Sequence, residues 1–535
     1  GADELVLRHT SRDGTVLWLR LGGVVPAVEA GVAVEAGDPV GAVAAGEGLL
    51  PAHVHVQLAL GPMETLPGLG RASLRSAWLA LCPDPSALLG LEAAAPAHER
   101  ADVLATRRRH VGRPQRLYYD DPPEMVRGWR QHLYDADGRA YLDVVNNVAV
   151  VGHSHPRITA AASRQLRLLN TNSRFLYDSM GRYASRLVEL MPAPLDTVFL
   201  VNSGSEANDL ALRLARTATE RYDVVALRGA YHGWTAATND LNTSPFYPHA
   251  AAAHVTGRHL VPAPDRYRGP YGADVPDAGR RYAEFVRQAC DAAAEGGAGV
   301  AAFICEPQLG NAGGVIAPPG YLHHAYAHVR AAGGLCIADE VQVGFGRLGT
   351  SFWGFEQQAA VPDIVTVAKP AGNGFPIGAV VTTRAISERF ARHTTLFSSV
   401  GGSPVSCEVG IAVLDVIRDE RLQQNAATVG EHLRAALGEL AGRHEAIGAV
   451  HGLGLHQGVD LVADRATRTP APDVAAAVCE RLLDVGIVVR PTGDHDNVLK
   501  VKPPLCFEAR DADRLVDSLD RLLRRDRRTS STPPS

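Results

Sequence analysis

Ile364-Val-Thr-Val-Ala-Lys369-Pro-Ala-Gly-Asn-Gly374 is the stretch that decides the fold of this 535-residue chain. A short apolar run, typical of a buried strand, ends here at a lysine. Earlier in the chain, a second apolar run starts at Leu335 and ends in the same way at Asp339. Because burying an unpaired charge is costly, an amine and a carboxylate at two such strand ends indicate a site with a bound partner.

Two further motifs complete a set of groups that suits one cofactor. Asn202-Ser-Gly-Ser205 joins a predicted strand to a predicted helix, where backbone N–H groups and the helix dipole favour a phosphate. Tyr231-His-Gly233 supplies a flat aromatic side chain after another apolar run. Pyridoxal phosphate needs a lysine for its aldehyde, an acid for its ring nitrogen, donors for its phosphate and a flat group on its ring.

Short apolar runs alternate with helical patterns throughout this region. Five runs have the length and composition of buried strands, at 196–201, 223–227, 300–305, 335–338 and 364–368, and 205–219 has helical spacing. Continuous apolar strands separated by helices predict an α/β fold with a mixed, mostly parallel sheet covered on both faces. Ligands of such sheets bind beyond the carboxyl ends of the strands, where the four motifs fall.

Length and composition are those of an ordinary globular protein. The chain is 46% apolar and 21% charged. Its net charge of −5 gives no field that attracts nucleic acid, and no apolar run is long enough for a membrane span. The seven cysteines have no paired spacing that suggests disulfides or a metal site, which favours a cytoplasmic location.

Changes in amino-acid composition and in hydrophobic pattern along the chain predict its domains. Glycine-punctuated β-like runs indicate a small all-β domain, a Pro-, Ala- and Leu-rich part indicates a connector, and the α/β region ends in a smaller unit and a Ser/Thr/Pro tail. The predicted parts are 1–62 (β domain), 63–106 (connector), 107–405 (large cofactor-binding domain), 406–525 (small α/β domain) and 526–535 (disordered tail). Since Gly1 lies within an apparent strand, we expect a fragment of a longer protein.

With these motifs, residues from about 107 to 525 resemble a class III (subgroup II) pyridoxal-phosphate-dependent aminotransferase of fold type I. The resemblance implies that Lys369 binds the cofactor's aldehyde as a Schiff base and that Asp339 pairs with its ring nitrogen. The other contacts that it implies are Gly204 and Ser205 to the phosphate, Tyr231 and Val341 on the two ring faces, Gln342 at the ring hydroxyl, and His232 and Glu306 beside the cofactor.

The same resemblance implies a homodimer with shared active sites, because in this family a hydroxyl group from the partner subunit contacts the phosphate. The matching position is Ser399, where threonine is usual. Its neighbour Ser403 replaces a common asparagine. These two differences from the usual family residues concern the contact between subunits, and the expected fold is unchanged.

A finer resemblance is to the ethanolamine-phosphate and phosphohydroxylysine phospho-lyases of this family. The runs that carry it are 141–148, 152–156, 170–178, 264–271 and 497–505. Within the first run, Asn146 and Asn147 stand where many transaminases have an Asp-Gly type turn. We therefore expect Asn146 to contact the substrate.

Lys500 and Lys502 give a physical argument for the same branch. Amino-acid transaminases usually need an arginine fork for the bidentate α-carboxylate. Here two lysines share one face of a predicted strand, and a lysine is a point charge that suits a phosphate dianion. The alternative is a pair of solvated strand lysines. Arg174 is a further candidate for binding the substrate's anion.

The expected reaction is the elimination of phosphate from a phosphorylated amino alcohol or amino acid, after which water hydrolyses the resulting enamine to an aldehyde and ammonia. Lys369 would act as general base and the cationic side chains would hold the departing phosphate. One alternative is an ω-type transaminase, which needs a keto-acid acceptor. Another is a binding module that has kept the fold without turnover, although the intact Lys369 and Asp339 argue against it.

Residues 1–62 resemble the second half of a lysostaphin-type zinc peptidase domain, through 37–41 and the pair His53 and His55. Two histidines that point the same way from a strand do not complete a zinc site, and Gly22 and Gly23 stand where a catalytic histidine is expected. We expect an inactive structural or docking module without a metal site, and the alternative is weak metal binding. Relatives with this arrangement have a small-molecule kinase domain further towards the N-terminus, which could install the phosphate.

Overall fold

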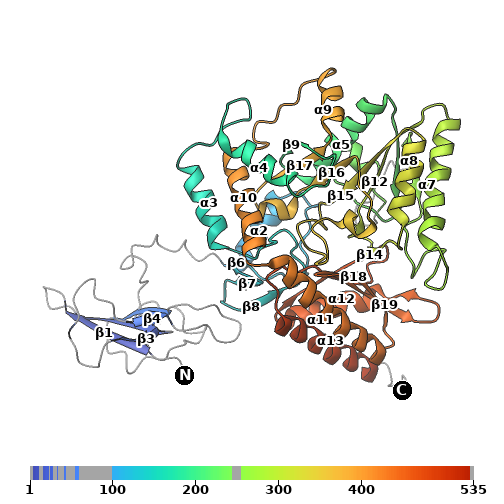
Figure 1. Ribbon diagram of the computed structural model, residues 1–535. Helices are drawn as coiled ribbons and strands as arrows, with labels where there is room; N and C mark the ends of the chain where they lie inside the picture. The colour runs from blue at the N-terminus through green and yellow to red at the C-terminus, as the bar shows by residue number, and fades with distance from the viewer. Residues whose placement is uncertain are drawn as a thin grey trace. The chain divides into compact units, whose positions relative to one another are not determined.

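The computed structural model describes residues 4–10, 16–22, 24–27, 33, 41–43, 55–59, 99–243 and 255–529 (Figure 1). The chain divides into two compact units, Gly1–Glu124 and Met125–Ser535. The predicted boundary at residues 106 and 107 falls inside a helix, α2 (Arg100–His110), of the first unit. Most of the predicted connector and the end of the predicted tail lie outside the described residues.

The first unit contains short strands that pair antiparallel. β1 (Glu4–Thr10), β2 (Val16–Gly22) and β5 (His55–Ala59) form one sheet, and β3 (Val24–Pro26) pairs with β4 (Gly41–Val43). The predicted β domain at 1–62 stays a prediction. The resemblance to a zinc peptidase stays a prediction, because His53 and the side chain of His55 lie outside what the structure describes.

The second unit is built on a seven-stranded sheet. Its strands are β9 (Thr197–Val201), β10 (Asp223–Leu227), β11 (Arg258–Val261), β12 (Val300–Cys305), β15 (Leu335–Asp339), β16 (Ile364–Val367) and β17 (Gly378–Thr382). In the order β11-β10-β12-β15-β16-β17-β9, every pair from β11 to β16 is parallel, and β17 is antiparallel to both of its neighbours. The predicted mixed, mostly parallel α/β sheet is confirmed.

Both faces of this sheet are buried, which explains why its strands read as continuous apolar runs. Val224 and Ala226 of β10 belong to one hydrophobic cluster with residues of α5 (Gly204–Thr219). Val225 and Leu227 belong to another with residues of α7 (Ala278–Glu295) and α8 (Tyr321–Ala331). Alternate side chains of one strand thus pack against helices on opposite faces.

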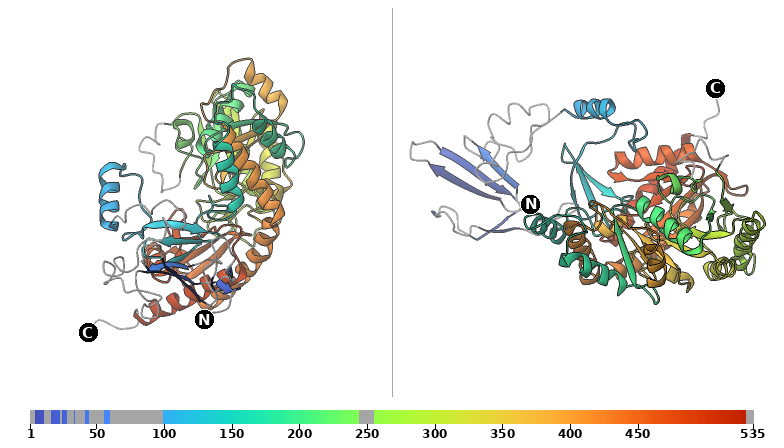
Figure 2. Two further views of the ribbon diagram at one scale, coloured as in Figure 1. Left: turned by 90° about the vertical axis from the view of Figure 1, so that its left-hand side faces the viewer. Right: turned by 90° about the horizontal axis from the view of Figure 1, so that it is seen from above.

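The remaining strands form two smaller sheets and a short hairpin. β6 (Met125–Trp129), β7 (His132–Asp135) and β8 (Ala140–Asp143) are joined by β21 (Ile487–Val488), so the start of the unit pairs with its C-terminal part (Figure 2). The C-terminal sheet contains β18 (Ile447–Leu453), β19 (His456–Asp464), β20 (Thr469–Pro470), β22 (Arg490–Thr492) and β23 (Val498–Val501). The hairpin is β13 (Gln308–Leu309) with β14 (Val315–Ile316).

Further helices complete the second unit. They are α3 (Pro156–Leu166), α4 (Asp178–Val188), α6 (Ala236–Asn239), α9 (Arg384–Ala391), α10 (Pro404–Asp419), α11 (Leu422–Arg443), α12 (Pro472–Asp484) and α13 (Ala509–Thr529), with 3₁₀ turns at Gly354–Gln358 and Lys369–Gly372. α13 ends at Thr529, inside the predicted tail, and its buried leucines at 519, 522 and 523 precede that tail. None of the helices in the described ranges is long and apolar enough to cross a membrane.

Candidate active site

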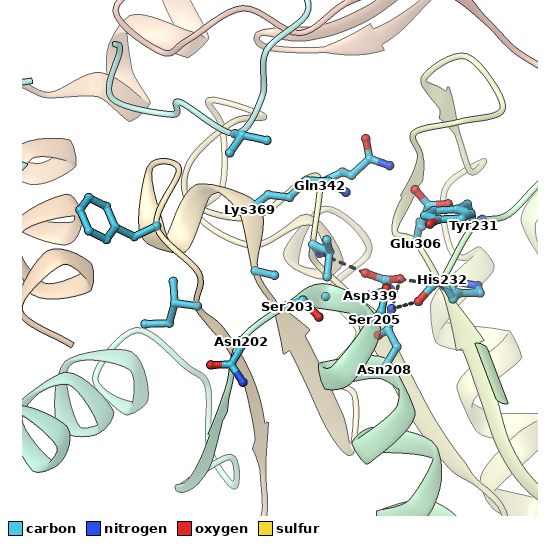
Figure 3. A pocket seen from close by; sticks show the side chains of 17 residues that line it. Asn202, Ser203, Ser205, Asn208, Tyr231, His232, Glu306, Asp339, Gln342 and Lys369 are labelled. Atoms are coloured by element: carbon cyan, nitrogen blue, oxygen red, sulfur yellow. Dashed lines mark hydrogen bonds and ion pairs between the residues drawn. The ribbon is translucent and has the colours of Figure 1, made fainter. Parts of the chain in front are cut away.

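A cavity of ≈ 360 Å³ lies at the carboxyl ends of the parallel strands. Its walls come from segments at or just after the ends of β9, β10, β12, β15 and β16, namely 202–208, 231–233, 306, 339–342 and 368–369. The structure brings nine of the predicted cofactor-binding residues together in this lining: Gly204, Ser205, Tyr231, His232, Glu306, Asp339, Val341, Gln342 and Lys369. Figure 3 shows several of these side chains.

Lys369 reaches into the middle of the cavity (Figure 3). It follows β16 with φ of 30°, in a region that non-glycine residues rarely adopt and that often marks a functional constraint. Its amine makes no hydrogen bond or ion pair with the residues that the structure describes. Burial lowers the pKa of this amine, while the negative charges of Asp339 and Glu306 act in the opposite direction. A larger fraction of uncharged amine makes this lysine a better nucleophile.

Asp339 is 2% exposed and is held by three donors. Its Oδ2 accepts a hydrogen bond from Asn208 Nδ2 at 2.8 Å and lies 2.7 Å from His232 Nδ1. Its Oδ1 accepts from the backbone N–H of Val341 at 3.1 Å. Such a network fixes the carboxylate against the floor of the cavity.

The N-terminus of α5 forms another wall. The Ser203 side chain caps this helix by accepting from the backbone N–H of Glu206 at 3.2 Å, so the first residues of the helix face the cavity. A Cβ atom at Gly204 would lie 2.9 Å from Val341 Cγ1, so only glycine fits there without a shift. The end of a long helix with its N–H groups towards a cavity suits an anion.

Tyr231 and Glu306 lie across the cavity from Lys369 (Figure 3). Glu306 accepts from the backbone N–H of Tyr231 at 3.3 Å and from that of Gly310 at 2.9 Å. Burial raises the pKa of the Glu306 carboxyl, and the nearby negative charge of Asp339 adds to this effect. The cavity therefore holds a second buried carboxyl group in addition to that of Asp339.

The four residues predicted to bind substrate differ in their surroundings. Asn146 caps its own turn by accepting from the Val148 N–H at 3.3 Å. Arg174 is exposed, with its guanidinium 4.1 Å from the centre of the Phe397 ring. Lys502 is 1% exposed, and its amine donates to main-chain and side-chain oxygens.

Lys500 is half-buried on β23, and its amine makes no hydrogen bond or ion pair within the described part of the chain. Burial lowers the pKa of this amine to about 7, with further lowering by Lys369 and Arg490 and an opposing effect from Glu306. Ser399, predicted to contact a partner's cofactor, is exposed and does not line the cavity of this chain.

Sequence reasoning assigned no role to two asparagines in this network. Asn208 holds Asp339, and Asn147 donates to Gln342 Oε1 at 3.2 Å. Asn208 lies four residues after Gly204 on one helix, a spacing that places both on the same face and could have identified it. No comparable signal exists for Asn147, because its partner is nearly two hundred residues away.

Comparisons with known proteins agree with this geometry. Residues 122–523 match the family model described as Aminotransferase class-III. The chain is 45% identical over 424 residues to "Alanine--glyoxylate aminotransferase 2-like" of Drosophila melanogaster, across 78% of this chain and 86% of that protein. It is 38% identical over 437 residues to "Ethanolamine-phosphate phospho-lyase homolog 1" of Caenorhabditis elegans, across 79% of this chain and 93% of that protein.

A solved structure described as a phospholyase from Arthrobacter in complex with phosphoethanolamine is also similar. Its TM-score is 0.76 at 37% sequence identity, and the match covers 81% of this chain and all of that one, at 100%. Similarity therefore extends to proteins named as transaminases and to proteins named as lyases.

Proposed function

Because the chain belongs to the class III aminotransferase family, whose enzymes use pyridoxal phosphate, we propose that it is a phospho-lyase. Its substrate would be a phosphorylated amino alcohol or amino acid, from which it releases phosphate and ammonia. The named relatives include a transaminase and phospho-lyases. The choice between the two reactions therefore depends on the residues around the cavity.

The cavity's residues fit the cofactor. The amine of Lys369 has no partner among the described residues and is available for an aldehyde, and the anchored carboxylate of Asp339 suits a protonated ring nitrogen. The start of α5, where Gly204 leaves no room for a Cβ, suits a phosphate group. When bound, the cofactor supplies an electron sink for the carbon that bears the amino group.

The chain's own residues would divide the remaining work. Lys369, whose pKa is lowered, would take the proton from the carbon next to the amino group. Asp339 would keep a proton on the ring nitrogen, since His232 and Asn208 hold its carboxylate in place. A cation near the substrate's phosphate would stabilise the negative charge that develops as the phosphate leaves.

Lys500 is the observation that carries the lyase proposal. Its charge interacts with those of Lys369 and Glu306, although it is not among the residues that line the cavity. Its amine has no hydrogen-bonded partner among the described residues. Lys502 already has two acceptors, and Arg174 is exposed. A lysine amine is a point charge, which suits a phosphate dianion better than a planar carboxylate. We therefore assign Lys500 to the phosphate of the substrate.

The proposed function is tested by incubating the holoenzyme with phosphoethanolamine and other phosphorylated amines in the absence of any keto acid. We expect inorganic phosphate and an aldehyde to appear in equal amounts. Turnover that occurs only after a keto acid is added, without phosphate release, would establish a transaminase instead. The transaminase alternative also has support, since the Drosophila relative at 45% identity is named as an aminotransferase.

Replacing Lys500 should weaken recognition of the phosphate. Lys500→Met should raise KM for a phosphorylated amine by about 10- to 100-fold, the usual range for a lost hydrogen bond to a charged group. KM for an amine without a phosphate group should stay close to that of the native enzyme. Equal KM changes for both amines would show that Lys500 does not contact the phosphate.

The pH dependence of phosphate binding tests whether the charge of Lys500 contributes to it. Since the pKa of Lys500 is about 7, its amine is charged below that pH and loses its charge above it. Inhibition by inorganic phosphate should therefore weaken above pH 7, by up to about tenfold per pH unit. Lys500→Arg stays charged in this range and should keep its affinity at pH 8 to 9. A pH profile shared by both proteins would contradict the assignment.

An exposed apolar surface supports a homodimer. Leu168, Leu176 and Phe397 are 73%, 102% and 46% exposed, and Arg174 joins the two segments by stacking on Phe397. Large apolar side chains that are exposed in these two segments are consistent with an interface. We propose that a second copy covers them and that each chain presents Ser399, in the same segment as Phe397, to the other's cofactor phosphate.

Disrupting this surface should affect both assembly and cofactor binding. Leu176→Asp should shift the protein from dimer to monomer in light scattering and weaken cofactor retention on dialysis, because each site would lose its partner's residues. Val485→Asp, which changes an exposed apolar residue elsewhere, is the matched control. A variant that is monomeric and retains its cofactor fully would rule out shared sites.

The described cysteines are consistent with a reducing compartment. Cys290, Cys305, Cys336, Cys407, Cys479 and Cys506 are all free and buried. Proteins of oxidising compartments usually pair such residues in disulfides. We propose the cytoplasm as the location of this enzyme.

A further inference from the structure

The amine of Lys502 is buried and already donates to oxygen atoms of the protein, unlike the amine of a lysine that is available to bind an anion. It follows β23, and its backbone N–H donates to the carbonyl of Val144 at 2.7 Å, in the segment that leads to Asn147. Its amine donates to the main-chain oxygen of Gly310 at 3.1 Å and to Gln342 Oε1 at 3.0 Å. Both acceptors are uncharged, so the amine needs no positive charge to satisfy them.

The charges around Lys502 favour this uncharged state. Burial lowers the pKa of its amine well below the usual value, and the positive charges of Lys500, Lys369 and Arg347 lower it further. Glu306 is the opposing negative group. With 1% of its surface exposed, the side chain is enclosed between β23 and the loops of the large domain.

The contacts of Lys502 determine how the amide of Gln342 is oriented. Gln342 Oε1 accepts from Lys502 Nζ and from Asn147 Nδ2, which together use the two lone pairs of an amide oxygen. Its Nε2 makes no hydrogen bond with the residues that the structure describes, and Gln342 lines the cavity. The network therefore leaves the N–H groups of this amide as donors to whatever fills the cavity.

Gly310 packs closely against the side chains of Gln342 and Lys502. A Cβ atom there would lie 2.8 Å from Gln342 Nε2 and 2.9 Å from Lys502 Nζ. The backbone N–H of Gly310 also donates to Glu306 at 2.9 Å. The same short segment thus fixes the carboxylate and both members of the amine–amide pair.

We propose that Lys502 is a positioning residue, which together with Asn147 holds the Gln342 amide so that Nε2 donates to the ring oxygen of pyridoxal phosphate. Lys502 then acts on the cofactor through Gln342 and does not touch the substrate. The proposal rests on the family's cofactor and is the same whether the enzyme is a lyase or a transaminase. It also connects the C-terminal sheet to the cofactor by one chain of hydrogen bonds.

The test follows the visible absorbance of the holoenzyme against pH, which reports the ionisation of the cofactor and does not require turnover. A donated hydrogen bond stabilises an ionised ring oxygen, so losing the donor should raise the pH midpoint. For Lys502→Met we expect an upward shift of about half to one pH unit, the range that one hydrogen bond supports. Gly310→Ala, which keeps the lysine and disturbs the pair, should move the midpoint in the same direction even if Lys502→Met folds poorly.

A double-mutant comparison separates positioning from direct contact. In a Gln342→Leu background, Lys502→Met should cause no further shift of the midpoint, because the side chain through which it acts is gone. An unchanged midpoint in Lys502→Met, or a full shift in the Gln342→Leu background, would overturn the proposal. A raised KM for phosphorylated amines with an unaltered spectrum would show instead that Lys502 binds the substrate.

Discussion

Lys369→Ala should abolish covalent attachment of the cofactor and lower kcat/KM by more than about 10³-fold, because it removes both the attachment point and the proposed general base. Three features single out this amine. It lies in the middle of the cavity lining, has no hydrogen-bonded partner among the described residues, and has a pKa that burial lowers. No other lysine lines this cavity in the part of the chain that the structure describes.

The measurement is the intact mass of the protein after reduction with borohydride, which makes an attached cofactor permanent. The native protein should gain the mass of one cofactor, and Lys369→Ala should gain none. Lys500→Met is the matched control, since it removes a neighbouring amine and should keep the attachment. Retention of the added mass in Lys369→Ala would place the attachment on another residue.

Asp339→Asn should lower kcat by about 10²–10³-fold, the usual cost of losing one preorganised electrostatic contact. The amide has the size of the carboxylate, so the cavity should keep its form. It carries no negative charge, however, and so cannot keep a proton on the ring nitrogen. Its NH₂ group would also face donors, since Asn208 Nδ2 and His232 Nδ1 lie 2.8 and 2.7 Å from Oδ2.

The adjacent Glu340 provides a control for this substitution. It is fully buried, with a pKa raised by burial to about 8, and it accepts hydrogen bonds from the backbone N–H groups of Gly354 and Phe355. Glu340→Gln should therefore change thermal stability more than kcat and leave the visible spectrum unaltered. If the two variants lose kcat to the same extent, the loss comes from general disruption and the role given to Asp339 is wrong.

The large sheet was predictable because its strands are buried on both faces. All five predicted strands agree with β9, β10, β12, β15 and β16 to within one residue at each end. β11 was missed because its sequence, Arg258-His-Leu-Val261, begins with polar residues. β17 was missed because it follows Pro376 and Ile377 directly, without a helix to separate it from the preceding loop.

The cavity lining was predictable for a different reason. Strands that run parallel bring their carboxyl ends to one edge, so residues after separate strands had to meet. The connections between the lining residues could not be predicted. Lys502 and Asn147 reach Gln342 from distant parts of the chain. Only the folded arrangement shows that the amine of Lys502 already has acceptors, while that of Lys500 has none among the described residues.

The fate of the substrate's nitrogen tests the proposed lyase activity most directly. Phosphoethanolamine labelled with ¹⁵N would be incubated with the holoenzyme in the presence of a keto acid, and the products followed by NMR. A phospho-lyase leaves all of the label as ammonium, with one phosphate released for each ammonium formed. Label that appears in an amino acid made from the keto acid, with the phosphate still attached to carbon, would contradict the proposal and identify the enzyme as a transaminase.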